Sequence, residues 1–261
     1  VPYRRNTAKA TMYTEAEIAA LKQYTDNGGK VILCSKSDRD NKYDNCAENS
    51  NALLTAIGAH SRIVNGIIVD NDLKANEAYR LYLSSKENFN TGHPFTAGAY
   101  TSSNAFGTTP ATDNQTGFQL YNGGPVEVLD ESKVQVLVRG YQSTWGTHYD
   151  GYFDGSSFVP EYDESVDGRV TVKKGDVNVM TYEDLPGGGW VITSGVTFFS
   201  NYDIKSDQDY ANRFILRNIL NSLKPAETVT EIADVHKAAE KEEFTVEGTV
   251  TANASGYDKN T

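Results

Sequence analysis

The chain has 261 residues, which is enough for one large domain or for a domain with a small appended module. Its 24 lysines and arginines stand against 35 aspartates and glutamates, so the net charge is −11, and such an acidic surface repels the phosphate backbone of nucleic acids. Its apolar runs stay short of the about 18 residues that suggest a membrane span. We therefore expect neither a nucleic-acid partner nor a membrane span.

The first clear segment predicts a helix that leads into a buried strand. Thr14 and Glu17 have the spacing of a capping box, and Gly28 with Gly29 supplies the stop. The apolar run at 30–35 is typical of a strand buried on both faces. A helix, a glycine stop and a buried strand together indicate half of a parallel α/β unit.

The central part of the chain predicts one further helix, several strands and long loops. The helix covers 48–58, with Asn49 or Ser50 as its cap and Gly58 as its stop. Hydrophobic patterning and turn-rich composition then predict one or two strands in 61–70, strands in 77–84 and 133–144, mainly loop in 91–124, and an extended loop or hairpin in 147–168.

The segment from 169 to 200 repeats the opening pattern. Strand alternation in 169–185 is broken by a turn at Lys174–Gly175, and the glycines at 187–189 lead into an apolar strand. A phosphate-cradling loop would follow a strand and open a helix, so we interpret this glycine run as a turn that feeds a strand.

A domain boundary is predicted after the last clear helix, which covers 207–224 and is closed by Pro225. The polar tail that follows ends in a single strand and resembles the first part of the OB-fold modules of secreted nucleases and other surface proteins. One strand cannot close a barrel. We therefore predict an α/β domain at 1–224, and a linker with a truncated OB-fold start at 225–261.

The order of motifs in residues 12–224 resembles a known family. The motifs are the helix–glycine–strand start, HPFTAG at His93–Gly98, and GGGWVITSGVTFFSNYD ahead of the final helix. They resemble class I glutamine-amidotransferase-like domains, and more narrowly the non-catalytic branch found in large secreted bacterial proteins. The resemblance implies an α/β, flavodoxin-like fold, with a mostly parallel sheet and helices on both faces.

The same resemblance implies that one part of the sheet is missing. Family domains begin with a strand–helix–strand segment of about 30 residues, and the residues before Thr14 are too few and too polar to supply it. The strand at Lys30–Ser35 would then lack its usual neighbour, and open edges of this kind recruit partners. We expect self-association at this edge, its coverage by another segment, or a chain that is a fragment whose N-terminal part lies elsewhere.

Cys34 stands where the family nucleophile would stand, without the residues that activate it. Working enzymes hold this cysteine in a G-x-C-x-G elbow and take a histidine and a glutamate from an H-x-E motif. Here Ile32 and Lys36 occupy the elbow positions, and none of the four histidines begins an H-x-E. We expect no amidotransferase activity, and we predict that the chain is not an enzyme.

The two cysteines leave two alternatives open. Cys34 and Cys46 are the only cysteines, and a polar loop separates them. In an oxidising compartment a disulfide between them would stabilise the fold by about 3 kcal/mol. Otherwise both stay thiols, and sequence spacing cannot decide between the two.

Two acidic stretches are candidate calcium sites, because carboxylates at alternate positions suit Ca²⁺. Neither has the central glycine or the terminal glutamate of an EF-hand loop, so solvated surface acids are the competing interpretation. Zinc is not expected, since the cysteines and histidines show no ligand spacing. The acidic residues are Asp38, Asp40 and Asp44 in the first stretch, and Asp70, Asp72 and Glu77 in the second.

An aromatic segment at 141–158 is a candidate glycan site. Aromatic rings beside acidic and amide groups can stack on sugars, and they can equally pack a long loop. His148 in the same segment could serve a hydrolase, although a solvated loop histidine is the simpler interpretation. The candidate ligand-binding residues are Tyr141, Trp145, His148, Tyr149 and Tyr152.

These features together predict a non-catalytic structural or interaction module of a larger extracellular or cell-surface bacterial protein. Its partners would be other domains of the same polypeptide. The first alternative is a carbohydrate-binding domain with a glycan partner, and the second is a hydrolase with a loop-assembled site. We predict no cofactor, with Ca²⁺ at the acidic stretches as the one candidate. The 16 tyrosines and 22 glycines favour the extracellular setting.

Overall fold

The computed structural model describes residues 12–37, 46–100, 117–148, 151–160, 170–201, 203–204 and 210–223. The chain divides into two compact units, Val1–Ile219 and Leu220–Thr261. The elements described below belong to the first unit, apart from the last turn of the final helix. The predicted OB-fold start at 225–261 lies outside the described residues, and the predicted division at 224 stays a prediction.

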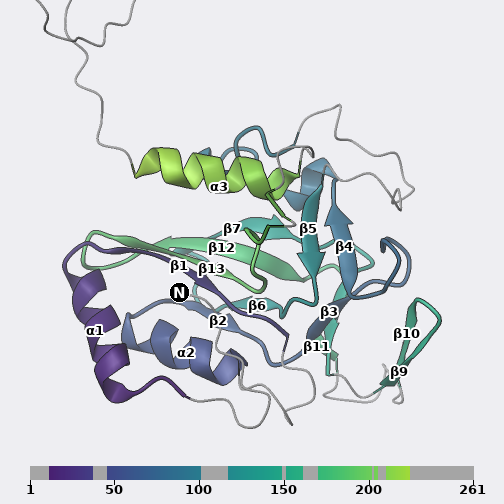
Figure 1. The fold of residues 1–261 in the computed structure, drawn as a ribbon, viewed down its shortest axis with the longest axis horizontal. Coiled ribbons are helices and arrows are strands. Elements are labelled where there is room, and N and C mark those ends of the chain that lie inside the picture. The colour runs from purple at the N-terminus through teal and green to yellow at the C-terminus, as the bar shows by residue number, and fades with distance from the viewer. Residues whose placement is uncertain are drawn as a thin grey trace, which may run out of the picture. The chain divides into compact units, whose positions relative to one another are not determined.

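A mixed sheet forms the centre of the first unit (Figure 1). Its strand order is β1-β13-β12-β6-β2, and β7 also pairs with β12. Only β1 and β13 run parallel, in a register that places Lys30 opposite Trp190 and Cys34 opposite Ser194. The other pairs of this sheet are antiparallel. The strands are β1 Lys30–Cys34, β2 Ser61–Ile63, β6 Val126–Val128, β7 Val134–Arg139, β12 Asn178–Asp184 and β13 Trp190–Ser194.

Three smaller antiparallel sheets extend the fold. One joins β11, β8 and β3, one joins β4 and β5, and the hairpin of β9 and β10 is the third. The hairpin lies in the segment where an extended loop or hairpin is predicted. The strands are β3 Ile67–Val69, β4 Arg80–Leu83, β5 Phe118–Tyr121, β8 Trp145–Thr147, β9 Gly151–Asp154, β10 Ser157–Pro160 and β11 Val170–Val172.

The predicted flavodoxin-like fold is wrong. The described residues form thirteen strands and three α-helices, and a single strand pair is parallel. A flavodoxin-like sheet needs a long crossover between each pair of parallel strands, whereas antiparallel neighbours need only a short turn. The turn at 186–189 is such a connection, because it joins β12 to β13 as antiparallel neighbours. This finding contradicts both the resemblance to amidotransferase-like domains and the parallel topology inferred from it.

Helices lie on both sides of the central sheet in Figure 1, with α1 and α2 on one side and α3 on the other. Side chains from α2 pack with Leu33 and Val191 in one apolar cluster, and side chains from α3 pack with Met180 and Ile192 in another. The sheet therefore separates two cores. The helices are α1 Glu15–Asp26, α2 Cys46–Ala56 and α3 Ala211–Ser222, with short 3₁₀ turns at Lys86–Asn88 and Pro94–Thr96.

The predicted cap of α1 is correct, whereas the predicted caps of α2 are not. The capping box of Thr14 and Glu17 is confirmed at the start of α1. The predicted caps of α2 are wrong, because Asn49 and Ser50 lie inside the helix and are buried. Their side chains instead serve tertiary contacts: Asn49 Oδ1 accepts from the backbone N of Tyr13, and Ser50 Oγ donates to Ser35 Oγ.

The glycines at 187–189 allow two turns to touch backbone to backbone. A Cβ on Gly189 would lie 1.9 Å from the carbonyl oxygen of Gly29, and one on Gly187 would lie 2.2 Å from that of Thr25. Only glycine fits at such an approach. The run is a turn that feeds β13, so this prediction from the sequence is confirmed.

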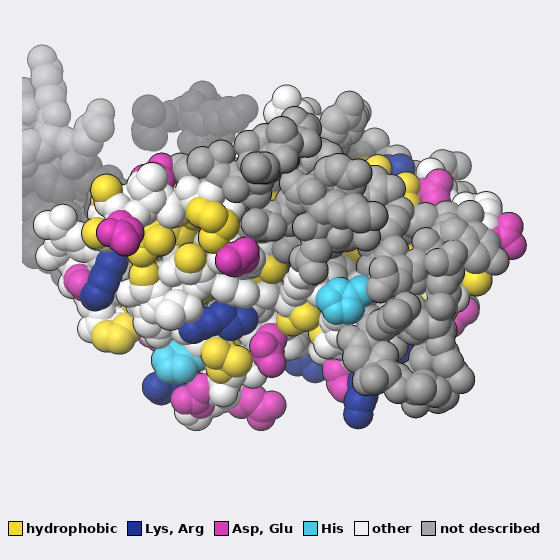
Figure 2. Space-filling view, turned by 90° about the horizontal axis from the view of Figure 1, so that it is seen from below, with side chains coloured by type: hydrophobic (Ala, Val, Ile, Leu, Met, Phe, Trp, Pro, Cys, Tyr) yellow, Lys and Arg dark blue, Asp and Glu magenta, His cyan; other side chains and the backbone are white. Residues whose placement is uncertain are grey.

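The described surface is chemically mixed on the face of Figure 2, where acidic and basic side chains alternate with hydrophobic ones. Among the helices that the structure describes, none has the length and apolar character needed to cross a bilayer.

Acidification is expected to destabilise the domain through His93. Its Nδ1 accepts from the backbone N of Phe95 at 3.1 Å, and burial lowers the pKa of its imidazole below 6.5. The unfolded chain binds the proton more readily, so the stability from neutral His93 is complete above pH 6.5 and is lost as the pH falls below it. Urea titrations at pH 7 and pH 5 give the free energy of unfolding at each pH. The decrease in this free energy from pH 7 to pH 5 should be smaller in His93→Asn than in the wild type. Equal losses in the two proteins would exclude this role.

Candidate functional site

Cys34 is a buried thiol at the end of β1. It is 1% exposed, and burial raises the pKa of its thiol to about 12. The thiolate is the nucleophilic form of cysteine. A thiol with this pKa is protonated at neutral pH and is unsuited to attack a substrate. Cys46, at the start of α2, is also buried, and no disulfide joins the two cysteines in the structure.

Cys34 is expected to resist alkylation in the native protein. A pKa of about 12 in place of 9.0 leaves about a thousandth of the usual thiolate at neutral pH. A mass-spectrometric time course with iodoacetamide should show slow labelling in buffer, and labelling of both cysteines in guanidinium without a reductant. Rapid stoichiometric labelling of native Cys34 would contradict the buried-thiol assignment, and an unlabelled pair in guanidinium would reveal the disulfide alternative.

A cavity of about 400 Å³ lies where the chain leaves the parallel strands β1 and β13. Hydrogen bonds bring three connections together here. Ser35 N donates to Ser194 O, Ser37 N donates to Asn122 O, and Gly124 N donates to Gly195 O. The paired strands β4 and β5 complete the wall. The cavity is lined by Lys36, Arg80, Gln119, Tyr121, Val196, Thr197, Ser200 and Asp203.

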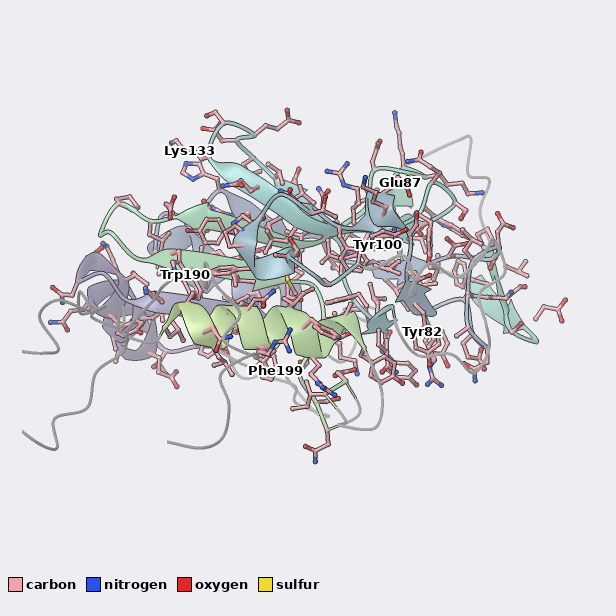
Figure 3. All side chains as sticks on the ribbon, turned by 90° about the horizontal axis from the view of Figure 1, so that it is seen from above. Tyr82, Glu87, Tyr100, Lys133, Trp190 and Phe199 are labelled. Carbon is pink, nitrogen blue, oxygen red and sulfur yellow. The ribbon has the colours of Figure 1, made fainter. Side chains whose placement is uncertain are left out.

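Arg80 presents a partly held guanidinium to this cavity. Its Nη2 donates to the hydroxyl of Tyr82 at 3.0 Å and its Nη1 to Asn76 Oδ1 at 3.4 Å, while its buried Nε has no hydrogen-bond partner among the described residues. The ring of Tyr82 stacks on that of Tyr210, with 6.3 Å between the ring centroids, next to the start of α3 (Figure 3). The two printed bonds use two of the five N–H donors of the guanidinium, so the group is oriented by Tyr82 and Asn76 and keeps donors for another group.

Gln119 presents an acceptor without a partner. Its backbone is held by Asn212 of α3, whose Oδ1 accepts from Gln119 N at 2.6 Å and whose Nδ2 donates to Gln119 O at 3.1 Å. Its side chain lines the cavity, the residue is only 6% exposed, and Oε1 has no partner within the described part of the chain. Buried amide oxygens of this kind are nearly always hydrogen-bonded in native proteins.

Asp203, in the chain segment that follows β13, supplies a carboxylate to the cavity lining. Burial raises the pKa of Asp203, and hydrogen bonds from Ser200 N at 2.9 Å and Ser200 Oγ at 2.5 Å oppose this effect. The cavity thus combines two cationic side chains, a carboxylate and an unpaired amide. No histidine or cysteine is among its described lining residues. The set can bind a polar molecule.

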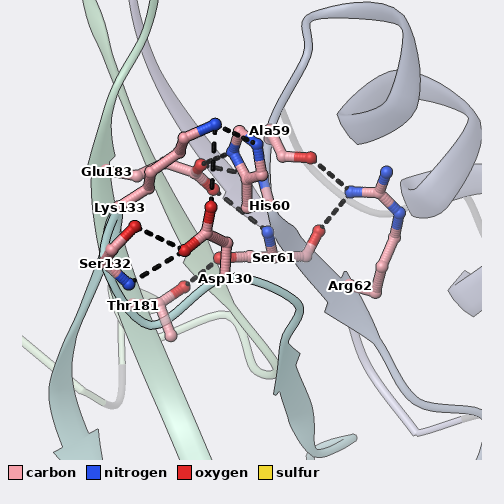
Figure 4. A network of polar contacts seen from close by, with 9 residues as sticks. All are labelled: Ala59, His60, Ser61, Arg62, Asp130, Ser132, Lys133, Thr181 and Glu183. Atoms are coloured by element: carbon pink, nitrogen blue, oxygen red, sulfur yellow. Dashed lines mark hydrogen bonds and ion pairs between the residues drawn. The ribbon is translucent and has the colours of Figure 1, made fainter.

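A second polar network joins the start of β2 and the strand β12 to the turn that precedes β7 (Figure 4). Glu183 is 1% exposed and accepts from His60 N, from Ser61 N and, at 3.1 Å, from His60 Nδ1. On the other side of the ring, Lys133 Nζ lies 3.0 Å from His60 Nε2. A carboxylate behind a histidine can orient a base. Here, however, the lysine covers the reactive nitrogen, and the network is better suited to holding β2 against β12.

The structure describes the side chains of three of the five candidate glycan-binding residues, and none of the three is exposed, so the glycan site stays a prediction. Trp145 is 2% exposed and packs with Ile67, Val69 and Phe158, while Lys174 Nζ lies 4.8 Å from its ring centroid. Tyr141 is half-buried and its hydroxyl donates to Tyr82 O at 2.5 Å. His148 is half-buried, whereas Tyr149 and the side chain of Tyr152 lie outside the described residues.

The structure describes only the second of the two acidic stretches that are candidate calcium sites. Asp38, Asp40 and Asp44 lie outside the described residues, so the first calcium site stays a prediction. In the second stretch Asp70 is fully buried and its carboxylate already accepts four hydrogen bonds. Within the described part of the chain, no group of three or more potential metal ligands occurs.

The cavity residues could not be found by their spacing. Lys36, Arg80 and Gln119 come from three separate segments, and ordinary charged and amide side chains mark no motif. One signal is visible. Ser200 and Asp203 have the spacing with which a hydroxyl and a carboxylate tie a turn together, and they lie in the connection that follows the buried strand β13.

Comparison with known proteins identifies no family. No family model matches the chain, and no curated protein matches it. One similar solved structure is titled "mmIFT52 N-terminal domain", with 15% sequence identity, a TM-score of 0.46, and coverage of 85% of this chain and 77% of that chain. A similarity of this size carries no argument about function.

Proposed function

We propose that the domain is a non-catalytic binding module that holds a small polar ligand in the cavity at the ends of β1 and β13. The observation that carries this proposal is the pair of unpartnered buried groups, Gln119 Oε1 and Arg80 Nε. Leaving a buried polar group unsatisfied costs about 1–3 kcal/mol. A ligand that pairs with both, once the two side chains turn toward it, would remove that cost. Four further buried atoms of the described residues also lack a partner, and these two are the ones that belong to the cavity lining.

The chemistry of the nearby residues supports binding over catalysis. Cys34 is a protonated thiol at neutral pH, because burial raises its pKa to about 12. Ser200 donates its hydroxyl to Asp203, without a histidine among the described lining residues to accept that proton during attack on a substrate. The hydrolase alternative based on His148 stays a prediction, as does self-association at Lys30–Ser35, where β1 lies at one end of the described strand order.

Replacing Gln119 by methionine tests the binding proposal. Methionine has a similar length and lacks the unpaired oxygen, so Gln119→Met should raise the free energy of unfolding of the unliganded protein by about 1 kcal/mol. The same change should abolish the stabilisation that a ligand confers. Thermal unfolding with a panel of small sugars, amino acids, organic acids and nucleotides measures both effects.

The matched control is Gln135→Met, since Gln135 is exposed on β7 and does not line the cavity. This variant should keep every ligand response of the wild type. A panel in which no compound raises the wild-type midpoint, or a Gln119→Met protein that responds like the wild type, would contradict the proposed function.

A further inference from the structure

We infer that the ligand of this cavity is an acidic sugar, meaning a sugar ring that carries a carboxylate and several hydroxyl groups. This inference rests on the proposed function and names the chemical class that the same cavity accepts. It follows from three features of the lining: two cationic side chains, a set of groups that accept or exchange hydroxyl protons, and an exposed aromatic ring.

The two cationic side chains of the lining favour a ligand that carries a carboxylate. Arg80 and Lys36 both line the cavity, and the Arg80 guanidinium is held by Tyr82 and Asn76 with Nε left over. A planar guanidinium matches the two oxygens of a carboxylate, and a neighbouring ammonium adds a second positive charge. A neutral sugar would leave the buried Nε without an anionic partner.

The acceptor groups of the lining require hydroxyl donors from the ligand. Gln119 Oε1 is an unpaired acceptor and can be satisfied only by a donor. The carboxylate of Asp203 also accepts, while the hydroxyl groups of Ser200 and Thr197 can accept or donate. A fully ionised inorganic anion has no hydrogen to offer Gln119 and would meet the Asp203 carboxylate. The vicinal hydroxyls of a sugar supply such donors.

An aromatic ring provides the third feature. The side chain of Tyr121 is 51% exposed, and its ring is fixed against Tyr79 in a T-shaped contact with 5.5 Å between the ring centroids. A fixed, exposed ring offers a flat apolar face to the C–H side of a sugar, beside the apolar side chain of Val196. The volume of about 400 Å³ lies in the usual range of ligand pockets and admits a ring of this size.

Isothermal titration calorimetry of the full chain tests the inference, with D-glucuronate, D-galacturonate and N-acetylneuraminate as probes. D-glucose, acetate, inorganic phosphate and adenosine monophosphate serve as comparison compounds. At least one acidic sugar should bind about tenfold or more tightly than glucose and than acetate, because only the acidic sugar offers a carboxylate to the cationic side chains and hydroxyl donors to the acceptors. Its affinity should fall about tenfold or more in Arg80→Gln, and by less in Arg80→Lys, which keeps the charge without the planar fork.

The matched control is Arg139→Gln, since Arg139 is exposed on β7 and lies outside the cavity lining. Circular dichroism checks that each variant is folded, and Arg80→Lys provides the test if Arg80→Gln is not. Equal loss in Arg139→Gln would overturn the assignment to this cavity. If phosphate or adenosine monophosphate binds and no acidic sugar does, the inference is wrong and the binding module stands. If nothing in this set or in the wider panel binds, the proposed function fails with it.

Discussion

Replacing Gly195 by alanine is expected to unfold the domain or to lower its free energy of unfolding by about 4 kcal/mol or more. A Cβ at this position would lie 1.7 Å from the carbonyl oxygen of Gly124. Neither backbone can easily withdraw, because Gly124 N donates to Gly195 O and Gly195 N donates to Val179 O, both at 2.9 Å. The same contact holds the segment that leads into the cavity, so ligand binding should be lost together with stability.

Gly92→Ala is the matched control. Its Cβ would meet only Asn90 Oδ1, at an ordinary 3.6 Å, and its backbone is outside the left-handed region. This substitution should change stability by less than about 1 kcal/mol, with stabilisation as the expected direction. Urea unfolding followed by circular dichroism compares the two variants. A Gly195→Ala protein as stable as Gly92→Ala would show that the two segments do not meet as described.

Replacing Asp70 by alanine is expected to destabilise the domain by about 3–5 kcal/mol. Its carboxylate is fully buried at the end of β3 and accepts from the backbone N of Asp72 and Leu73, and from the hydroxyls of Ser143 and Thr144, at 2.7–2.8 Å. Truncation leaves four donors without their acceptor. Because the bonds act as one network, their losses are not additive.

Two companion variants sharpen this test. Asp70→Asn keeps one acceptor oxygen, so its loss of stability should be intermediate. Asp72→Ala removes an exposed neighbouring carboxylate and keeps the backbone N–H that Asp70 binds, so its effect should stay within about 0.5 kcal/mol. Unfolding free energies from urea titrations rank the three proteins. Equal values for Asp70→Ala and Asp72→Ala would contradict the role given to the buried carboxylate.

Elements set by neighbouring residues could be predicted from the sequence. The capping box of Thr14 and Glu17, the apolar run of β1 and the amphipathic pattern of α3 each depend on a few adjacent positions. The caps of α2 could not be predicted, because the polar side chains of Asn49 and Ser50 form tertiary hydrogen bonds with Tyr13 and Ser35. A cap and a buried tertiary donor or acceptor look alike in sequence.

Strand pairing could not be predicted, because it depends on distant segments. The glycine run before Trp190 resembles the glycine stop before β1, and the mostly parallel sheet was inferred from the family resemblance of such motifs. In the structure the run closes a tight turn, with Leu185 N donating to Gly189 O and Gly188 N donating to Leu185 O, so β12 and β13 become antiparallel neighbours. The cavity depends on the same long-range pairing, and its residues carried no local signal.

The most direct test of the binding cavity is chemical-shift mapping by NMR on ¹⁵N-labelled protein during titration with the tightest acidic sugar. We predict chemical-shift changes in the side-chain amide of Gln119 and in the backbone amides of Lys36, Thr197 and Ser200, with saturation at one ligand per chain. Saturable changes confined to the aromatic segment 141–158, with the cavity amides unchanged, would contradict binding in the cavity.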